Sequence, residues 1–307
     1  MKDQRGLPAL NSSWNQLNQN TSPAPLTFGA IGDAYGFCFE FAKPNFVNSY
    51  NDLHYHQHPE FTVRPGAYSD DTQMHIAVAE LMLSNDEWTK LNVATKFVNT
   101  FKRDPRAGYA KGFHAFLTNV RSGSELLHTI KPTSDRNGAC MRASAIGLLP
   151  DISTVKHHAI LQARVTHDTV GGIDSAVAAA LMSHYFVYQL GDKSDLPVFL
   201  TQHLPAHLWT ANWAGKVRVH GISTVQAALT VIVASTSLTE ILQRSVAFTG
   251  DVDSVATIAC ACASSSRQFQ RDIPAQLWDG FESSDWGLDY LHDLDQRLVN
   301  KFVAQEN

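Results

Sequence analysis

Two short segments, far apart in the chain, carry the residue types best suited to bind a metal ion. The first, residues 68–74, places Asp70 and Asp71 between the hydroxyls of Ser69 and Thr72, directly before an apolar run. Adjacent aspartates repel each other, so both stay ionised at low cost only if a positive charge lies near them. A helix N-terminus supplies a little of that charge and a cation supplies much more. Alone, such a segment is more commonly a helix cap.

The second segment, residues 249–254, repeats this chemistry. Asp251, Asp253 and Ser254 precede an apolar run of small residues, 255–263. In an irregular turn, residues i and i+2 can direct their side chains to one point. Two such clusters are explained poorly as independent surface caps and well as halves of one site. Carboxylate and hydroxyl oxygens favour Mg²⁺, Mn²⁺ or Ca²⁺ over zinc, and four carboxylates would suit two ions roughly 3.5–4 Å apart.

Other segments could contribute to the same site. Glu40 follows an apolar run, so its carboxylate is either exposed at a helix end or placed in a cleft. The polar loop 134–142 could present free backbone amides to an anion, although an ordinary Asn-Gly turn would look the same. A histidine in a turn, such as His167, is more often structural than a ligand. We expect His54, His56 and His58 to form a solvated cluster rather than a metal site.

Composition limits the class of protein. The chain has 307 residues, 44% of them hydrophobic, and a net charge of -5, which gives no basic field for nucleic acid. The four cysteines form no C-x-x-C pair, which favours reduced, packed thiols in a reducing compartment. We also expect no apolar run long enough to cross a bilayer. These features predict a cytoplasmic protein that acts on neither nucleic acid nor membrane.

The apolar periodicity predicts helices and no strand of useful length. We expect an all-α chain with one compact domain at 25–307, preceded by a polar arm, 1–24, which is either a tail or a partner-binding extension. Segment 41–66 should be an irregular loop. Small residues spaced along 28–36 indicate close helix packing or a catalytic role for the glycines. The expected helices span 28–36, 74–82, 87–103, 111–120, 140–149, 153–165, 172–190, 223–235, 238–248 and 255–263.

Taken in order, the motifs resemble those of the ADP-ribosylglycohydrolases related to the dinitrogenase-reductase-activating glycohydrolase. The similarity covers about residues 26–278. The occurrence of all these motifs in the same order is far more specific than any single motif. Small departures occur, with Ser254 where threonine is frequent and Asp135-Arg136 where small residues are usual. The matching residues are Gly29, Gly32-Asp33-Ala34, Gly36 and Glu40; Tyr68 to Met74; Asn137-Gly138-Ala139 and Met141-Arg142; Thr166-His167; and Gly250-Asp251, Asp253 and Ser254.

The resemblance implies a compact orthogonal helix bundle with a central cleft for two divalent cations, Mg²⁺ or Mn²⁺. The implied metal ligands are Ser69, Asp70, Asp71, Asp251, Asp253 and Ser254, with Glu40, Asp70, Asp71 and Asp253 in catalysis. The implied contacts to ADP-ribose are Gly112, Ser134, Asn137, Gly138 and His167. The implied reaction is removal of ADP-ribose from a protein side chain, arginine first and serine next.

Two other functions remain open at this stage. Family members also serve as immunity proteins, and the arm 1–24 could plug the active site of an ADP-ribosyltransferase toxin, with or without catalysis. A two-metal phosphoesterase would use the same ions, but it would leave the ribose-pocket segments unexplained.

Overall fold

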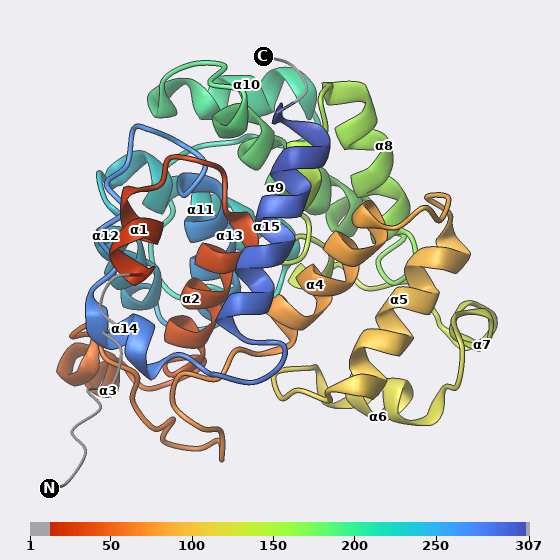
Figure 1. The fold of residues 1–307 in the computed structure, drawn as a ribbon, viewed down its shortest axis with the longest axis horizontal. Helices are drawn as coiled ribbons and strands as arrows, with labels where there is room; N and C mark the ends of the chain where they lie inside the picture. Colours follow the sequence, from red (N-terminus) through yellow and green to blue (C-terminus); the bar gives the residue numbers. More distant parts are fainter. Residues whose placement is uncertain (1–12, 305–307) are drawn as a thin grey trace, which may run out of the picture.

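The computed structural model describes residues 13–304, and this range contains helices, turns and isolated β-bridges but no strand (Figure 1). The prediction of an all-α fold is therefore confirmed. The α-helices are α1 (Ser13–Gln19), α2 (Pro25–Phe37), α3 (Pro44–Tyr50), α4 (Asp70–Leu83), α5 (Lys90–Arg103), α6 (Lys111–Asn119), α7 (Gly123–Thr129), α8 (Ile152–Ala163), α9 (Val170–Val187), α10 (Leu196–His203), α11 (Gly221–Ala234), α12 (Leu238–Ala247), α13 (Asp253–Ala263), α14 (Ala275–Gly280) and α15 (Leu288–Phe302). Short 3₁₀ turns are η2 (Asn137–Ala139), η3 (Ser144–Leu148) and η4 (Lys193–Asp195).

Side-chain caps determine where many of these helices begin. Thr89 accepts a hydrogen bond from the Asn92 amide, so α5 begins at Lys90 rather than at the expected residue 87. A capping side chain satisfies one of the amides that the first turn leaves without a partner. The side chains that cap in this way are Ser69, Thr89, Ser122, Asp151, Thr169 and Ser237.

Helices α2 and α13 form the centre of the fold, and every residue of both is buried. Their backbones approach closely because α2 presents glycine toward α13. A Cβ on Gly32 would lie 2.4 Å from the Ala256 carbonyl oxygen, and one on Gly36 would lie 2.4 Å from Asp253 Cα. These glycines are therefore packing residues, and Gly36 abuts one of the predicted metal ligands.

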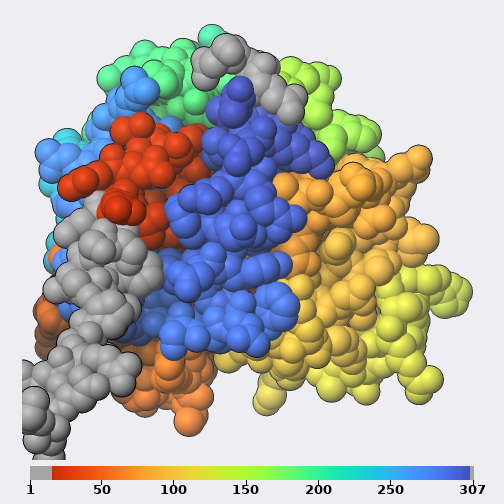
Figure 2. Space-filling view, viewed as in Figure 1, coloured from red at the N-terminus to blue at the C-terminus, as the bar shows by residue number. Residues whose placement is uncertain are grey.

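The C-terminal helix α15 closes this core, although the sequence patterns did not predict it. In Figure 2 the blue C-terminal segment lies between the red N-terminal helix and the orange segment that follows. The buried Asp295 of α15 accepts hydrogen bonds from the amides of Leu26 (2.9 Å) and Thr27 (2.8 Å). It thereby caps α2 from the far end of the chain, because α2 has no capping side chain of its own.

The expected N-terminal arm is only partly described. Residues 1–12 lie outside the described residues. Within the described part, Leu17 of α1 is buried and Asn18 Nδ2 donates to the Ile273 carbonyl at 2.9 Å. The role of residues 1–24 as a tail or a partner-binding extension stays a prediction.

Three local expectations were wrong. Segment 140–149 is a turn followed by η3 rather than an α-helix, because the Ala145 amide donates to His75 Nε2 (2.9 Å) instead of to the helical carbonyl four residues earlier. Segment 41–66 contains a helix, α3. His58 is buried rather than solvated: its Nε2 donates to the Glu40 carbonyl at 2.7 Å.

One helix, α9, differs from the expectation that no apolar run is long enough to cross a bilayer. Helix α9 has 18 residues and is long and apolar enough to cross a membrane, but 78% of it is buried inside the fold, as in a core helix. No other helix in the described range passes this test. All four cysteines are free and buried, as predicted.

Candidate functional site

The described residues enclose a cavity of about 830 Å³ that could bind a ligand. A cavity of this size is within the range of small-molecule sites. It draws residues from segments that are distant in the sequence. The predicted site residues that line it are Glu40, Asp70, Asp71, Gly112, Ser134, Asn137, Gly138, His167, Asp251, Asp253 and Ser254.

One wall of the cavity is the N-terminus of α4. Ser69 is fully buried and is not among the lining residues; its hydroxyl accepts a hydrogen bond from the Asp71 amide at 3.3 Å, so it caps the helix. The cap interpretation of this segment is therefore confirmed, and its role in metal binding stays a prediction. Asp70 and Asp71 occupy the first turn, where the helix dipole favours their negative charge. The Asp70 amide also donates to the Ala107 carbonyl at 3.0 Å, which ties the turn to the next loop.

Asp33 of α2 holds this wall from behind, and the sequence patterns assigned it no role. Its Oδ2 accepts from the Ser69 amide (3.0 Å), the Thr72 amide (3.0 Å) and the Thr72 hydroxyl (2.6 Å). Asp33 is fully buried, and burial raises its pKa. The sequence did contain a sign of this role. Asp33 is a carboxylate within the apolar run 28–37, and a buried carboxylate is tolerated only where hydrogen-bond donors surround it.

The opposite wall is the turn that leads into α13. Gly250 has a φ of +95°, and a Cβ there would lie 2.0 Å from the Val217 carbonyl oxygen, so glycine is required. The Asp251 amide donates to that same carbonyl at 3.2 Å. Asn137 Nδ2 then donates to Asp251 Oδ1 at 3.0 Å, which joins the predicted anion loop to the predicted metal wall.

The carboxylates of the α13 wall converge with that of Glu40. Oxygen atoms of Glu40, Asp251 and Asp253 lie within 4.8 Å of one another, and all three residues are buried. Asp71 Oδ2 and Asp253 Oδ1 are buried without a hydrogen-bond partner among the described residues. Buried carboxylate oxygens without donors are the atoms that a hard divalent cation would satisfy. The residues present therefore fit the predicted metal chemistry.

The proton affinities of these groups reflect the same crowding. Burial, and then the charges of Asp251, Asp70 and Asp33, raise the pKa of Glu40 to about 9. Burial and then neighbouring carboxylates likewise raise the pKa of Asp71 and of Asp253 well above the usual range. Raised pKa values mean that full ionisation of this cluster costs free energy, and a bound cation would lower that cost.

The Glu40 segment is anchored by backbone bonds on both sides. The Phe41 amide donates to the Gly250 carbonyl at 2.7 Å, with Phe41 in a left-handed conformation (φ 52°). His58 Nδ1 accepts from the amides of Glu60 (3.0 Å) and Phe61 (2.8 Å), while its Nε2 donates to the Glu40 carbonyl. His58 thus joins segment 60–63, which lines the cavity, to the segment that carries Glu40.

The predicted ADP-ribose residues come from several elements that line the cavity. The Asn137 amide donates to the Val219 carbonyl (2.9 Å), and the Thr169 hydroxyl donates to the Ser134 carbonyl (2.9 Å). A Cβ on Gly138 would come within 3.0 Å of the His167 ring, so only glycine leaves that edge of the histidine open. Gly112 lies on α6 at the exposed rim, with no heavy atom within 4 Å of its Cβ position.

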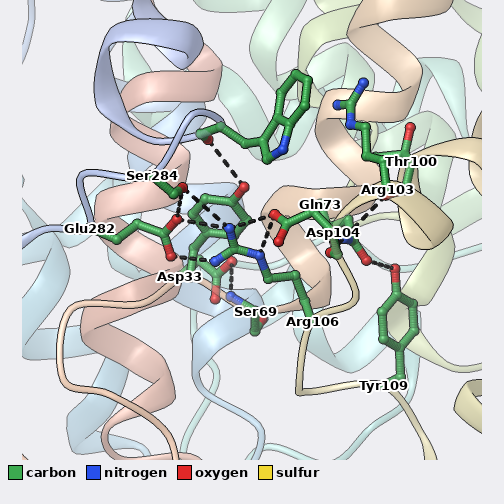
Figure 3. A network of polar contacts seen from close by, with 12 residues as sticks. Asp33, Ser69, Gln73, Thr100, Arg103, Asp104, Arg106, Tyr109, Glu282 and Ser284 are labelled. Carbon is green, nitrogen blue, oxygen red and sulfur yellow. Dashed lines mark hydrogen bonds and ion pairs between the residues drawn. The ribbon is translucent and has the colours of Figure 1, made fainter.

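A polar network braces the α4 wall (Figure 3). Arg106 pairs with Glu282 and with Asp104, and its guanidinium lies 3.9 Å from the centre of the Tyr68 ring. Tyr109 donates to Gln73 Oε1 at 2.6 Å. From the sequence, only Tyr68 and Gln73 were noted, as parts of the motif at residues 68–74. The network itself was not predicted, because its bonds join segments that are far apart in the chain.

The fold and the site together define a class of protein. The family model for ADP-ribosylglycohydrolases matches residues 26–307, and this chain belongs to that family. The family predicted from the ordered motifs is thereby confirmed. A solved structure described as an ADP-ribosylglycohydrolase-related protein complex has the same fold, with a TM-score of 0.69 and 17% identity, covering 93% of this chain and 99% of that chain.

Among curated proteins, the chain is similar to the ADP-ribosylhydrolase ARH3 of Xenopus tropicalis, at 30% identity over 127 residues. It is also similar to human ADP-ribosylhydrolase ARH3, at 27% identity over 146 residues. These alignments cover 38% and 45% of this chain, and 36% and 39% of the two relatives, so each matches less than half of either protein. An uncharacterized protein of Archaeoglobus fulgidus is 24% identical over 299 residues, which cover 88% of this chain and 95% of that protein.

Proposed function

We propose that this protein is a metal-dependent hydrolase that removes ADP-ribose from modified protein side chains. One observation carries the proposal: two carboxylate walls and the loop of Asn137, Gly138 and His167 line a single cavity. The walls suit divalent cations, and the loop suits a large polar ligand beside them. Family membership and the curated ADP-ribosylhydrolase relatives support the same reaction.

The proposed chemistry divides between the two sides of the cavity. Bound divalent cations, Mg²⁺ or Mn²⁺, would supply Lewis-acid polarisation and offset the carboxylate charge. Cleavage at a ribose C1 develops oxocarbenium character, so the site must fix the sugar and admit one water. The Asn137 loop would orient the ligand, while the carboxylates of Asp70, Asp71 and Asp253 would hold the reacting end. Glu40 is our candidate for proton transfer, because its carboxylate lies beside those of Asp251 and Asp253 in the cavity and is not among the implied metal ligands.

Arginine is the acceptor side chain that we favour, with serine next. Phe41 and Phe61 line the cavity beside Glu40 and are 41% and 39% exposed, and Glu60 lines it with them. Aromatic faces next to a carboxylate suit a guanidinium group, which stacks on rings and pairs with acids. This surface would bind the leaving group of an arginine-linked substrate.

The test is a parallel assay on arginine-linked and serine-linked ADP-ribosylated proteins, with and without Mg²⁺, that measures released ADP-ribose. We expect release that depends on the metal and is lost in Asp70→Ala and Asp253→Ala. Asp293→Ala, on the exposed face of α15, is the matched control and should keep full activity. Full release by either site variant in chelated buffer would overturn the proposal. Hydrolysis of a simple phosphoester, with no release of ADP-ribose, would favour the phosphoesterase alternative.

The role as an immunity protein stays a separate prediction. Deleting residues 1–24 while leaving the cavity intact would test it, because loss of binding to an ADP-ribosyltransferase toxin is expected only if the arm makes the contact. Toxin binding that survives the deletion and is abolished by Asp253→Ala would contradict it.

A further inference from the structure

A short chain of buried hydrogen bonds runs beneath the cavity from Arg142 to His167. Arg142 Nη2 donates to the Thr166 hydroxyl at 2.8 Å, and that hydroxyl lies 2.6 Å from His167 Nδ1. The three residues are buried, and all three line the cavity. Nothing in the chain of bonds is a carboxylate, so each proton in it can be assigned from the donors and acceptors alone.

The assignment begins at Arg142, because a guanidinium can only donate. The Thr166 oxygen therefore accepts from Arg142, and its single O–H proton still needs an acceptor in a buried position. His167 Nδ1 is the acceptor in reach. If Nδ1 carried a proton instead, the largely buried Thr166 O–H would have no acceptor among the described residues, which would cost the free energy of a lost hydrogen bond. Nδ1 is therefore unprotonated, and the ring proton of the neutral histidine lies on Nε2.

That Nε2–H faces the cavity. The Gly138 Cβ position is 3.0 Å from His167 Cε1 and 3.2 Å from Nε2, so the open edge of the ring is the one beside the predicted ligand loop. Among the described residues, Nε2 has no hydrogen-bond partner, and His167 is 8% exposed. A buried donor that points into a ligand cavity without a protein acceptor is available to a ligand oxygen.

Arg142 is itself fixed, so the chain of bonds has a rigid origin. Its Nε donates to Gln162 Oε1 at 2.6 Å, and its guanidinium lies 4.2 Å from the centre of the Phe97 ring. Gln162 donates in turn to the Ala139 carbonyl at 2.9 Å, within the loop that carries Gly138. Burial, followed by the charges of Arg142 and Arg136, lowers the pKa of His167 to about 3. The ring accordingly stays neutral at physiological pH.

We infer that Arg142 and Thr166 are positioning residues that hold His167 as the neutral Nε2–H tautomer, so that His167 donates a hydrogen bond to an acceptor oxygen of the bound ligand. The identity of that ligand as ADP-ribose rests on the proposed function, whereas the tautomer does not. The substitution that tests the inference is Thr166→Val, which keeps the shape of the side chain and removes the hydroxyl. Thr166→Ser is the matched control, because it keeps the hydroxyl.

The experiment measures the tautomer by long-range ¹H–¹⁵N NMR on protein labelled with ¹⁵N-histidine. The His167 signals are assigned by their loss in His167→Gln. We expect a pyridine-type Nδ1 and a pyrrole-type Nε2 in the wild type and in Thr166→Ser. In Thr166→Val we expect a mixture of tautomers and, by calorimetry, roughly 3- to 10-fold weaker binding of ADP-ribose, the equivalent of one hydrogen bond.

A merely structural role for Thr166 would leave the tautomer unchanged, so the NMR readout separates the two. A pyrrole-type Nδ1 in the wild type would overturn the inference, as would a Thr166→Val protein that keeps the wild-type ¹⁵N pattern. If the tautomer pattern is as expected but the wild type does not bind ADP-ribose, the tautomer stands and the proposed function fails.

Discussion

Asp33 offers the sharpest test of how the α4 wall is held in place. In the folded protein its Oδ2 receives three hydrogen bonds, two from backbone amides and one from a hydroxyl. Asp33→Ala removes the acceptor and leaves the amides of Ser69 and Thr72 buried without partners. The Thr72 hydroxyl can rotate away, but the two amides cannot. Asp33→Asn keeps one oxygen at this position and therefore keeps part of the bonding.

The magnitude follows from these two amides. A buried donor without a partner costs about 1–3 kcal/mol, which gives about 2–6 kcal/mol for the pair. Burial of the carboxylate raises its pKa, so its removal recovers part of that cost, and we expect about 2–4 kcal/mol for Asp33→Ala. At about 2 °C per kcal/mol for a chain of this size, the melting temperature should fall by about 4–8 °C. Asp33→Asn should cost about 1 kcal/mol.

Thermal melting and ADP-ribose release, measured together well below the melting temperature, check this prediction. We expect Asp33→Ala to lose about 100-fold in activity, because a shift of the Asp70–Asp71 turn by about 1 Å misplaces the reacting groups. The control is Asp151→Ala, which removes an exposed N-cap from α8, away from the cavity, and should leave the activity unchanged. The reasoning is refuted if Asp33→Ala melts within about 1 °C of the wild type, or if it is as active as Asp33→Asn.

Three further perturbations test the packing, the metal chemistry and the pH response of the fold. Gly36→Ala places a Cβ 2.4 Å from Asp253 Cα, so we expect α13 to shift, activity to fall about 100-fold and the free energy of unfolding to fall by about 1–3 kcal/mol. Mg²⁺ or Mn²⁺ at 100 times its Kd should stabilise the wild type by about 2.7 kcal/mol in a melting assay, and Asp71→Asn should remove most of that gain. Burial lowers the pKa of His75 to about 3, so the unfolded chain takes up a proton there at a higher pH than the folded protein does. Stability should thus fall as pH falls from about 6.5 toward 3, and urea unfolding at pH 5 and 7.5 should show that His75→Gln removes about 2 kcal/mol of the difference.

Each of these has a control and a contrary result. For the packing test, Gly171→Ala is suitable, since the nearest heavy atom to its Cβ position is 3.7 Å away, and equal losses in the two variants would contradict the argument. For the metal test, an equal thermal shift in Asp71→Asn and wild type would show that the ion binds elsewhere. For the pH test, the same pH dependence in His75→Gln and wild type would show that other groups cause the acid response.

The sequence predicted the site where the local signal was strong and the chemistry repeated. Asp70 and Asp71 precede one apolar helix, and Asp251 and Asp253 precede another, and all four residues line the same cavity. Their joint binding of metal stays a prediction. The small residues of α2 and α13 indicated close helix packing, which needs them. The helix bundle followed from periodicity alone.

The remaining features depend on contacts between distant parts of the chain. Segment 140–149 has the apolar pattern of a helix, but its Ala145 amide bonds to His75, which no local pattern reveals. His58 alternates with two other histidines, and only the fold shows that it is the one that reaches the Glu40 carbonyl. Asp33 was visible in its motif as a residue without an assigned task, because its partners lie on a different helix.

The close contact between Gly36 and Asp253 also bears on the order in which the protein becomes functional. Gly36 lies near the N-terminal end of the sequence and Asp253 near its C-terminal end. The acidic walls therefore face each other only after α13 has docked on α2. Contacts of such long range form after the entropy of closing a large loop has been lost. During synthesis, a chain that has not yet released α13 therefore carries half of the carboxylates and no cavity. Metal affinity would then report on completed assembly of the whole bundle.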